Sequence, residues 1–389
     1  MPVLNPEGLM EERIEAIRAY HKAASIPRAV VLVSGGVDSA VILGLCSWAL
    51  GAGNVAASFV GLNSSQDSLN RARAVSKVFG VRLIELDLTN TFQDVLGHVI
   101  QGVEYSYPAG PWWGGPGLKS PGERAMVEVR KNLDKDPTIL GSLRSCLRAP
   151  IGDLLNRLFG ASIFHGTGNE DEDRVIRFFN KRGDGAVDTN PIEMLSKGEV
   201  FQLAQALGVP DCILNARPSP DLWGKGEAHN DEDEIKAFLK LEDIQLPMYS
   251  YVDYTTGRYK NVGLIERLHR LLDEVVEANN LWSLDFEYRP AVEQVLFQDD
   301  PLTDQWRDIL VRTARPFFAD QSYDYATILK ILEAFRRAER ITRHKKNDNI
   351  PTLGTRRALV ERGLLTDKLP NLDGVQHENV SSDEERSEA

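Results

Sequence analysis

The run SGGVDS, from Ser34 to Ser39, has the residue types of a polyphosphate site. It follows the apolar run Ala29 to Val33 and leads into a helical stretch, so its backbone N–H groups point outward at the carboxyl edge of a strand. Gly35 and Gly36 let the backbone approach phosphate oxygens, and the two serines add hydroxyl donors. The carboxylate of Asp38 would be repelled by a polyphosphate unless Mg²⁺ lay between them. The alternative is a tight Gly-Gly turn capped by Asp or Ser.

A second polar segment, GTGN at residues 166–169, follows another apolar run that ends at His165. If both runs are strands of one parallel sheet, the two loops face the same crevice, which is typical of a nucleotide site. Four consecutive acids come next, Glu170 to Asp173. Their simplest interpretation is the solvated first turn of a helix. The neighbouring polyphosphate loop favours the other interpretation, a metal ligand among them.

The elements that must position these loops follow from hydrophobic periodicity. Helices are predicted over residues 7–24, 39–50 and 66–79, and strands over 29–33, 55–62, 81–86 and 161–165. The alternation of strands and helices predicts an α/β fold with a doubly wound parallel sheet. Two further helices are expected near residues 194–207 and 263–278.

Composition excludes several classes of protein. The 389 residues are 42% hydrophobic and 26% charged, which suits one large or two medium globular domains. The sequence has neither a membrane-spanning apolar run nor a secretion signal, and its three cysteines are expected to be free thiols, so we expect a cytoplasmic protein. A formal net charge of −12 disfavours a nucleic-acid partner. Small-molecule chemistry is the default.

The run SGGVDS resembles the PP-loop of the N-type ATP pyrophosphatases, which cleave ATP to AMP and pyrophosphate. The segment GTGNEDEDRVIRFFNKRGDGAVDTNPIEMLSKGEVFQLAQALGVPDCILNARPSPDLW resembles the core of NAD synthetases in letters and in spacing. Near the end, ILKILEAFRRAERITRHKKNDNIP resembles the C-terminal helix and His-Lys segment of the same family. The resemblance implies the adenine nucleotide alpha hydrolase-like fold and covers residues 7–103, 136–235 and 325–352.

The resemblance also implies roles for individual residues. The ATP-binding set is Ser34, Gly35, Gly36, Val37, Asp38, Ser39, Thr167, Lys197 and Ser219, within which Asp38, Lys197 and Ser219 form the catalytic set. Asp38 and Glu172 are the implied ligands of Mg²⁺. Arg148, Lys181, Asp188, His344 and Lys345 are implied to bind the acid substrate, the last two arriving from the C-terminus, often of a partner subunit. Taken alone, Lys197 would be an exposed helix cation and RITRHKK a basic helix end favoured by the macrodipole.

In the family reaction, ATP adenylates the carboxylate of deamido-NAD, pyrophosphate leaves, and ammonia displaces AMP to give NAD. The chain departs from the family on the acid side. Cys146 stands where relatives carry an arginine, Arg177 where a glycine is usual, and Asn180 where a threonine is usual. Either Arg177 relocates the lost charge, or the pocket accepts a different carboxylate, such as a nicotinate mononucleotide or a biosynthetic acid. A catalytically silent nucleotide sensor is the alternative outside the enzymes, and the retained Asp38, Glu172 and Lys197 argue against it.

The organisation of the chain follows from these matches. We expect an ATP-binding domain in two halves, residues 1–103 and 136–235, which are separated by a Pro/Gly/Trp-rich insertion at 104–135. A second insertion of unknown role, 236–325, follows. A helical C-terminal extension, 326–370, and a disordered acidic tail, 371–389, come last. The PP-loop comes within about forty residues of the start, so we expect no glutaminase domain in this chain. Either free ammonia is used or a separate subunit supplies it. A homodimer is the family expectation.

Overall fold

The fold is that of a computed structural model, which describes residues 3–106, 138–216, 231–253, 259–278, 304–342, 345 and 353–366. Its central sheet has four parallel strands in the order β3-β2-β1-β4. The strands are β1 (Arg28–Leu32), β2 (Val55–Gly61), β3 (Leu83–Asp87) and β4 (Ser162–His165). Strand β1 lies inside the sheet because it pairs with β2 on one side and β4 on the other, and its residues 29–31 are apolar and buried.

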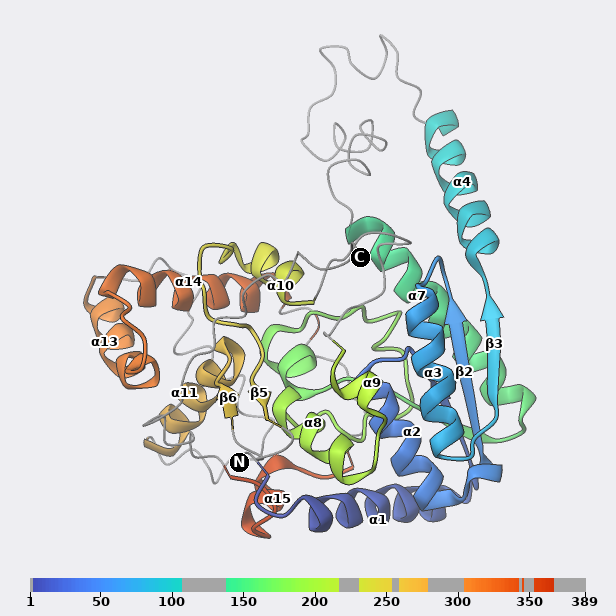
Figure 1. The fold of residues 1–389 in the computed structure, drawn as a ribbon. Helices are drawn as coiled ribbons and strands as arrows, with labels where there is room; N and C mark the ends of the chain where they lie inside the picture. The colour runs from blue at the N-terminus through green and yellow to red at the C-terminus, as the bar shows by residue number, and fades with distance from the viewer. Residues whose placement is uncertain are drawn as a thin grey trace, which may run out of the picture.

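Helices cover both faces of this sheet (Figure 1). On one face lie α2 (Val37–Leu50) and α3 (Gln66–Val78), with α1 (Pro6–Ala24) and α8 (Lys197–Ala206) packed against α2. The other face is covered by α7 (Thr138–Leu158), whose Leu155 packs with Val30 and Phe164 of the strands. The predicted doubly wound α/β fold is confirmed.

The predicted elements of this part agree with the structure. The strands and helices expected over residues 7–86 are α1, β1, α2, β2, α3 and β3, with bounds that differ by at most two residues. The strand expected at 161–165 is β4, and the helix expected at 194–207 begins at Lys197 as α8. Ser196 caps α8 in a capping box with Glu199, which explains where that helix begins.

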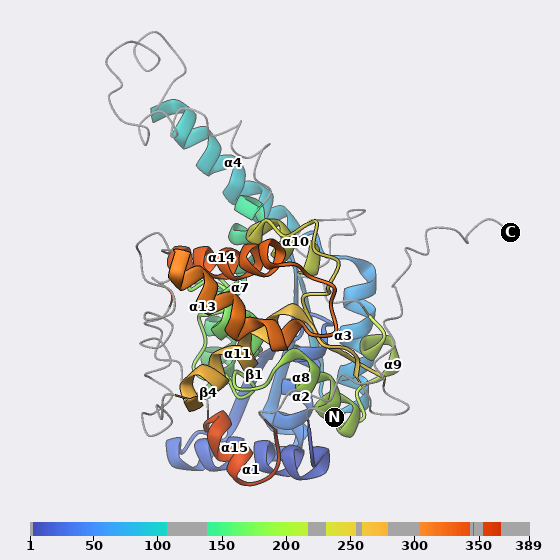
Figure 2. The same cartoon turned by 90° about the vertical axis from the view of Figure 1, so that its left-hand side faces the viewer.

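Helix α4 (Thr89–Ser106) was not predicted. It extends away from the sheet, and its last residues, 104–106, belong to the Pro/Gly/Trp-rich insertion expected over 104–135 (Figure 2). The rest of that Pro/Gly/Trp-rich insertion, residues 107–135, lies outside the described residues.

A second group of elements follows α8 and the short α9 (Asp211–Leu214). It contains α10 (Asp231–Leu239), the antiparallel pair β5 (Tyr251–Val252) and β6 (Tyr259–Asn261), α11 (Leu264–Ala278), α13 (Asp304–Ala314), η5 (Arg315–Phe318) and α14 (Tyr325–Thr342). All of these elements except β6 contribute residues to a second hydrophobic cluster. The predicted helix near 263–278 is confirmed as α11. The domain boundaries at 235/236 and 325/326 stay predictions, and the cluster contains residues from both sides of each.

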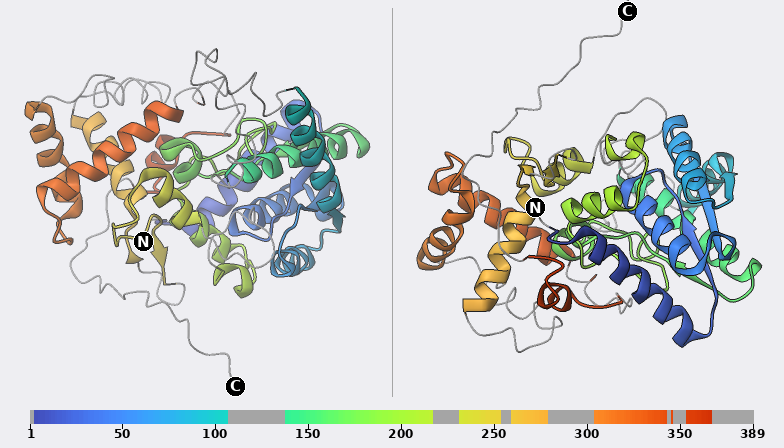
Figure 3. Two further views of the ribbon diagram at one scale, coloured as in Figure 1. Left: turned by 90° about the horizontal axis from the view of Figure 1, so that it is seen from above. Right: turned by 60° about the horizontal axis from the view of Figure 1, so that its bottom comes forward.

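The C-terminal part of the described chain returns to the N-terminus. Helix α15 (Arg356–Glu361) lies beside α1, as the right-hand view of Figure 3 shows, and Leu359 and Leu364 join the first hydrophobic cluster. Backbone pairing of Val3 with Leu365 closes this contact. The predicted acidic tail, 371–389, lies outside the described residues. Within the described ranges, no helix combines the length and apolarity that crossing a membrane requires.

Candidate active site

The SGGVDS turn joins β1 to α2 in a conformation that its glycine makes accessible. Gly35 has φ +86°, and a Cβ there would lie 2.3 Å from the carbonyl oxygen of Ser68. A larger residue would therefore displace the turn from α3. The Ser34 and Ser39 hydroxyl oxygens lie 3.1 Å apart, and the Gly36 N–H donates to Ser34 Oγ at 3.2 Å. The turn is held in shape before any ligand binds.

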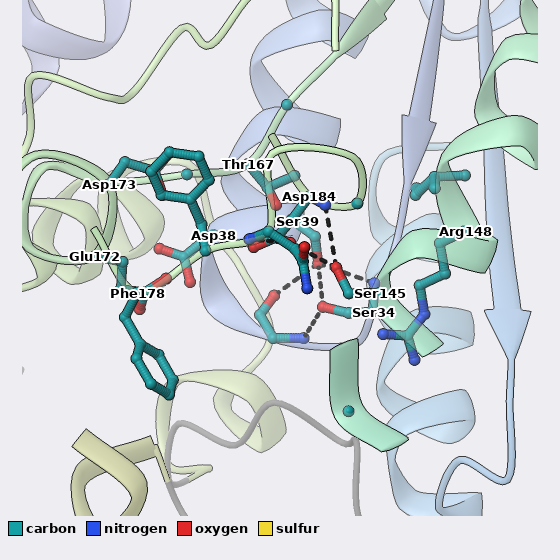
Figure 4. Close-up of a pocket in the computed structure, with 18 of the residues that line it drawn as sticks. Ser34, Asp38, Ser39, Ser145, Arg148, Thr167, Glu172, Asp173, Phe178 and Asp184 are labelled. Carbon is teal, nitrogen blue, oxygen red and sulfur yellow. Dashed lines mark hydrogen bonds between the residues drawn. The ribbon is translucent and has the colours of Figure 1, made fainter. Parts of the chain in front are cut away.

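The turn forms one wall of a cavity of about 1180 Å³ at the carboxyl edge of the sheet. Figure 4 shows Ser34, Asp38 and Thr167 near its centre, with Arg148 of α7 to one side and Phe178 to the other. Because β1 and β4 pair side by side, the loops that follow them open into the same cavity. The two polar segments read from the sequence therefore meet, as predicted.

Lys197 bridges the two carboxylates that were predicted to hold metal. Its ammonium nitrogen Nζ lies 2.7 Å from Asp38 Oδ2 and 2.8 Å from Glu172 Oε1. The Lys197 side chain is only 3% exposed, whereas those of Asp38 and Glu172 are 16% and 25% exposed. Tyr249 donates its hydroxyl to Glu172 Oε1 at 3.1 Å, and its ring lies 5.3 Å from Lys197 Nζ. We call Asp38, Glu172 and Lys197 the cavity triad.

The two carboxyls of the cavity triad differ in electrostatic environment. Burial raises the pKa of Asp38, and the ammonium of Lys197 only partly opposes that effect. Burial acts in the same direction on Glu172, but Lys197 and the donors around it outweigh burial and lower the pKa of that carboxyl. Asn169 donates its amide to Asp38 Oδ1 at 3.1 Å, so both oxygens of Asp38 are held. One cation serves two acids here.

The donor set fits Mg²⁺ held jointly by protein and nucleotide. Both carboxylates reach one point, since Lys197 Nζ touches both, and Mg²⁺ prefers one or two carboxylates together with substrate phosphates and water. Within the described ranges no group of three or more His, Cys, Asp or Glu side chains could hold a metal by itself. An all-protein metal cage is therefore not the arrangement that these residues form.

The four consecutive acids have four separate surroundings. They lie in η2 (Glu170–Ile176), a π-helical turn that begins after Asn169. Glu170 is 0% exposed and accepts from Arg356, and Asp171, 1% exposed, accepts the Lys197 backbone N–H at 3.0 Å. Asp173 accepts from the Asn190 amide at 2.9 Å. The solvated-turn interpretation is wrong for Glu170 and Asp171, and of these four acids only Glu172 is bridged to Asp38.

Comparison with known proteins identifies the family to which the chain belongs. A model of the family described as NAD synthase matches residues 9–104 and 143–277, more than half of the chain. The chain belongs to the NAD synthase family. A similar relative, an NH(3)-dependent NAD(+) synthetase of Alkaliphilus metalliredigens, is 28% identical over 262 residues, which cover 66% of this chain and 91% of the relative.

Other matches come from distant organisms. The NH(3)-dependent NAD(+) synthetase of Methanopyrus kandleri is 29% identical over 293 residues, or 74% of this chain and 90% of the relative. A solved NH3-dependent NAD synthetase from Campylobacter jejuni is 20% identical, with a TM-score of 0.42, over 61% of this chain and 85% of that one. Membership of the NAD synthase family confirms the predicted enzyme class, a carbon–nitrogen ligase, and ATP is the family's co-substrate.

Of two further residues that the NAD synthase family leads us to expect in ATP binding, one is described by the structure and the other is not. Thr167 lines the cavity beside the SGGVDS turn. Ser219 lies outside the described residues, as does His344 of the expected acid-binding pair. Their roles stay predictions.

The expected acid-binding residues divide into two groups. Arg148 and Lys345 line the cavity. Lys345 donates to the carbonyl of Arg177 at 2.8 Å and to that of Phe179. Asp188 and Lys181 do not line this cavity, and Asp188 accepts from the Phe164 N–H at 2.8 Å, which ties it to β4. A substrate role for Asp188 and Lys181 stays a prediction.

The three departures from the NAD synthase pattern have distinct surroundings. Arg177 has φ +52°, the left-handed region in which glycine is unstrained, and its side chain lines the cavity at 6% exposure. The backbone carbonyl of Asn180 accepts hydrogen bonds from the N–H groups of Gly183 and Gly185, so Asn180 shapes the turn that follows. Cys146 does not line the cavity, and burial raises the pKa of its thiol. The position of Arg177 gives a backbone reason for the usual glycine.

Some residues that line the cavity were not predicted from the sequence. Tyr249 comes from the second insertion, whose residues carried no motif. Phe238 of α10 also lines the cavity, with its ring centroid 5.7 Å from that of Phe178. Glu234, beside it, has its pKa raised to about 7 by burial and by the charge of Asp233. Only the acid-rich start of α10 could have drawn attention to this wall.

Proposed function

We propose that this protein adenylates the carboxylate of deamido-NAD with ATP and then transfers ammonia to it. The products are NAD, AMP and pyrophosphate. The observation that carries this proposal is the cavity triad, in which Lys197 joins Asp38 to Glu172 beside the SGGVDS turn. The relatives named NH(3)-dependent NAD(+) synthetase support the same reaction.

Each step has residues to perform it. The backbone N–H groups and hydroxyls of the turn bind the phosphates, and Thr167 and Ser219 complete the contacts to ATP. Asp38 and Glu172 would hold Mg²⁺, which, when bound, neutralises charge that develops on the phosphates. Lys197, already beside both acids, stabilises the leaving pyrophosphate, and this kind of electrostatic stabilisation is usually the largest catalytic effect. The substrate carboxylate attacks the α-phosphorus, so no protein nucleophile is required.

The acceptor side supports an anionic aromatic substrate. The cations Arg148, Arg177 and Lys345 share the cavity with the rings of Phe178 and Phe238. These residues provide charge for phosphates and flat apolar surface for a pyridine or adenine ring. The specific alternative is another carboxylate, a nicotinate mononucleotide or a biosynthetic acid, and Arg177 is the observation that favours it. Lys181, Asp188 and His344 belong to the proposed acid-binding set on family grounds, and a homodimer is proposed on the same grounds.

Pyrophosphate release tests the proposal. The purified full chain is supplied with ATP, Mg²⁺, ammonium and, in turn, deamido-NAD, nicotinate mononucleotide and unrelated acids, and product amide is measured in parallel. We expect release and amide formation with deamido-NAD. Release only with another acid would assign the alternative acceptor, whereas nucleotide binding without release would assign a sensor.

Replacing ammonium by glutamine in the same assay tests the nitrogen source. We expect ammonium to support amide formation and glutamine not to, because the relatives that this chain matches are named NH(3)-dependent NAD(+) synthetases. Turnover with glutamine at the ammonium rate would contradict this. Ammonia reaches the enzyme either free or from a separate supplying subunit.

A further inference from the structure

Arg71 of α3 joins the SGGVDS turn to the helix beside it. Its Nε–H donates to the carbonyl oxygen of Gly35 at 3.0 Å, and its Nη2 donates to Ser68 Oγ at 3.1 Å. The Ser68 carbonyl is the atom that leaves no room for a side chain at Gly35. Arg71 therefore contacts the turn at the point of closest approach between α3 and the turn.

The guanidinium has donors left for a ligand. An arginine carries five N–H groups, and the two hydrogen bonds of Arg71 with described residues use two of them. The side chain is partly buried and lines the same cavity as Ser34, Asp38 and Lys197. The remaining N–H groups lie in a fixed plane, since Nε and Nη2 are both anchored. A planar, anchored fork of this kind suits phosphoryl oxygens.

The other cations of the cavity are placed differently. Lys197 lies between two carboxylates, Lys345 contacts the carbonyls of residues 177 and 179, and Arg148 approaches the Val60 carbonyl at 3.4 Å. Arg71, in contrast, hydrogen-bonds a backbone carbonyl of the phosphate turn, that of Gly35. Two residues further along α3, Arg73 is exposed and forms a bidentate pair with Glu85.

We infer that Arg71 binds a phosphoryl oxygen of the ATP polyphosphate and of the pyrophosphate product. This inference rests on the proposed function, because it takes the SGGVDS turn as the polyphosphate site. It adds a residue of α3 to a site otherwise built from the ends of β1 and β4 and the start of α8. Arg71 binds through charge and two or more N–H donors, and it takes no part in bond making.

The test measures binding of ATP, inorganic pyrophosphate and adenosine to the full chain by calorimetry, with KM for ATP measured beside it. Arg71→Met removes the charge at similar length, and Arg71→Lys keeps charge but loses the anchored fork. Arg73→Gln on the same helix is the matched control. We expect Arg71→Met to weaken the binding of ATP and of pyrophosphate about ten- to a hundredfold and the binding of adenosine less than twofold. The affinity of Arg71→Lys for ATP and pyrophosphate should lie between those of Arg71→Met and wild type, and the affinity of Arg73→Gln should equal that of wild type.

The outcomes separate the inference from its basis. Equal weakening of all three ligands would overturn it, because Arg71 would then only shape the turn. Wild-type affinity for pyrophosphate in both Arg71 variants would overturn it too. If Arg71→Met does not fold, the Arg71→Lys values decide between these outcomes. Failure of the wild-type chain to bind ATP or pyrophosphate would instead reject the proposed function.

Discussion

Two clusters of buried charge lie on either side of the Glu170–Asp173 turn, and they differ in balance. The cavity triad has two acids around one lysine, and both acids retain exposure to the cavity. The other cluster, which we call the interior network, consists of Glu170, Glu199, His269, Arg270 and Arg356. Its acids are 0% exposed, and Arg356 donates to both oxygens of Glu199 at 2.8 Å.

The difference indicates which cluster can receive a ligand. In the interior network each acid contacts cationic or imidazole nitrogens, so no carboxylate oxygen is left facing an open space. In the cavity triad an excess of negative charge faces a cavity beside a phosphate turn, which is an arrangement that a cation completes. The interior network supports the triad from behind. Glu199 caps the helix that begins with Lys197, and Asp171 accepts that residue's N–H.

Removing an acid of the cavity triad should have the largest effect on activity. We expect Asp38→Ala and Glu172→Ala each to lower Mg²⁺-dependent pyrophosphate release by about a thousandfold or more, since both metal and phosphate contacts are lost. The fold should persist, because the remaining acid still pairs with Lys197. Release is measured against Mg²⁺ concentration, with circular dichroism as the control. Near-wild-type turnover of either variant would show that its carboxylate holds no metal.

Removing a charged side chain from the interior network should mainly affect stability. Arg356→Gln removes the Arg356 guanidinium from Glu199 and Glu170, and breaking a buried ion pair in this way costs about 3–5 kcal/mol in free energy of unfolding. Arg357→Gln, on the same helix, breaks an exposed pair with Glu361 and should cost at most about 0.5 kcal/mol. Urea unfolding measures both. Equal losses would remove the distinction between a buried network and a surface pair.

The sequence predicts the phosphate turn well and the interior network not at all, for a physical reason. The turn is local: an apolar strand, two glycines and a helix are contiguous from Ala29 to Leu50. The network joins Glu170 to Arg356, which are 186 residues apart. Asp171 and Glu172 are neighbours in sequence, yet one meets a backbone N–H and the other a lysine. Only packing of distant helices decides which acid meets which partner.

A third buried polar contact, between two histidines, differs from both clusters because no opposite charge faces it among the described residues. His21 Nε2 and His165 Nε2 lie 2.8 Å apart, and burial, followed by the effect of His21, lowers the pKa of His165 to about 3. An unfolded histidine titrates near 6.5. Between about pH 6.5 and pH 3 the unfolded state therefore binds a proton that the folded state does not, so stability falls as pH falls.

This pH effect can be isolated with a variant. The free energy of unfolding is measured from pH 7 to pH 4 for wild type, His165→Gln and, as a control, His98→Gln on the exposed face of α4. Each buried neutral histidine contributes a slope of up to about 1.4 kcal/mol per pH unit. We expect His165→Gln to reduce the slope by about that amount and His98→Gln to leave it unchanged. An unchanged slope in His165→Gln would mean that the folded state protonates the pair.

The smallest expected effects concern Arg177, for which the backbone strain and the charge lead to opposing predictions. Replacing it by glycine should stabilise the fold by up to about 1 kcal/mol, because a left-handed non-glycine residue is strained by that order. If Arg177 also binds the acid, Arg177→Gly should weaken deamido-NAD about tenfold or more, the value of one charged hydrogen-bond contact. KM for deamido-NAD and the free energy of unfolding are measured for wild type, Arg177→Gly, Cys146→Arg and the double variant that combines the two changes. Higher stability with unchanged, efficient turnover would reject a retuned pocket. Poor wild-type turnover that the double variant rescues would instead show that these two positions together select another carboxylate, and that the cavity triad serves it with unchanged ATP chemistry.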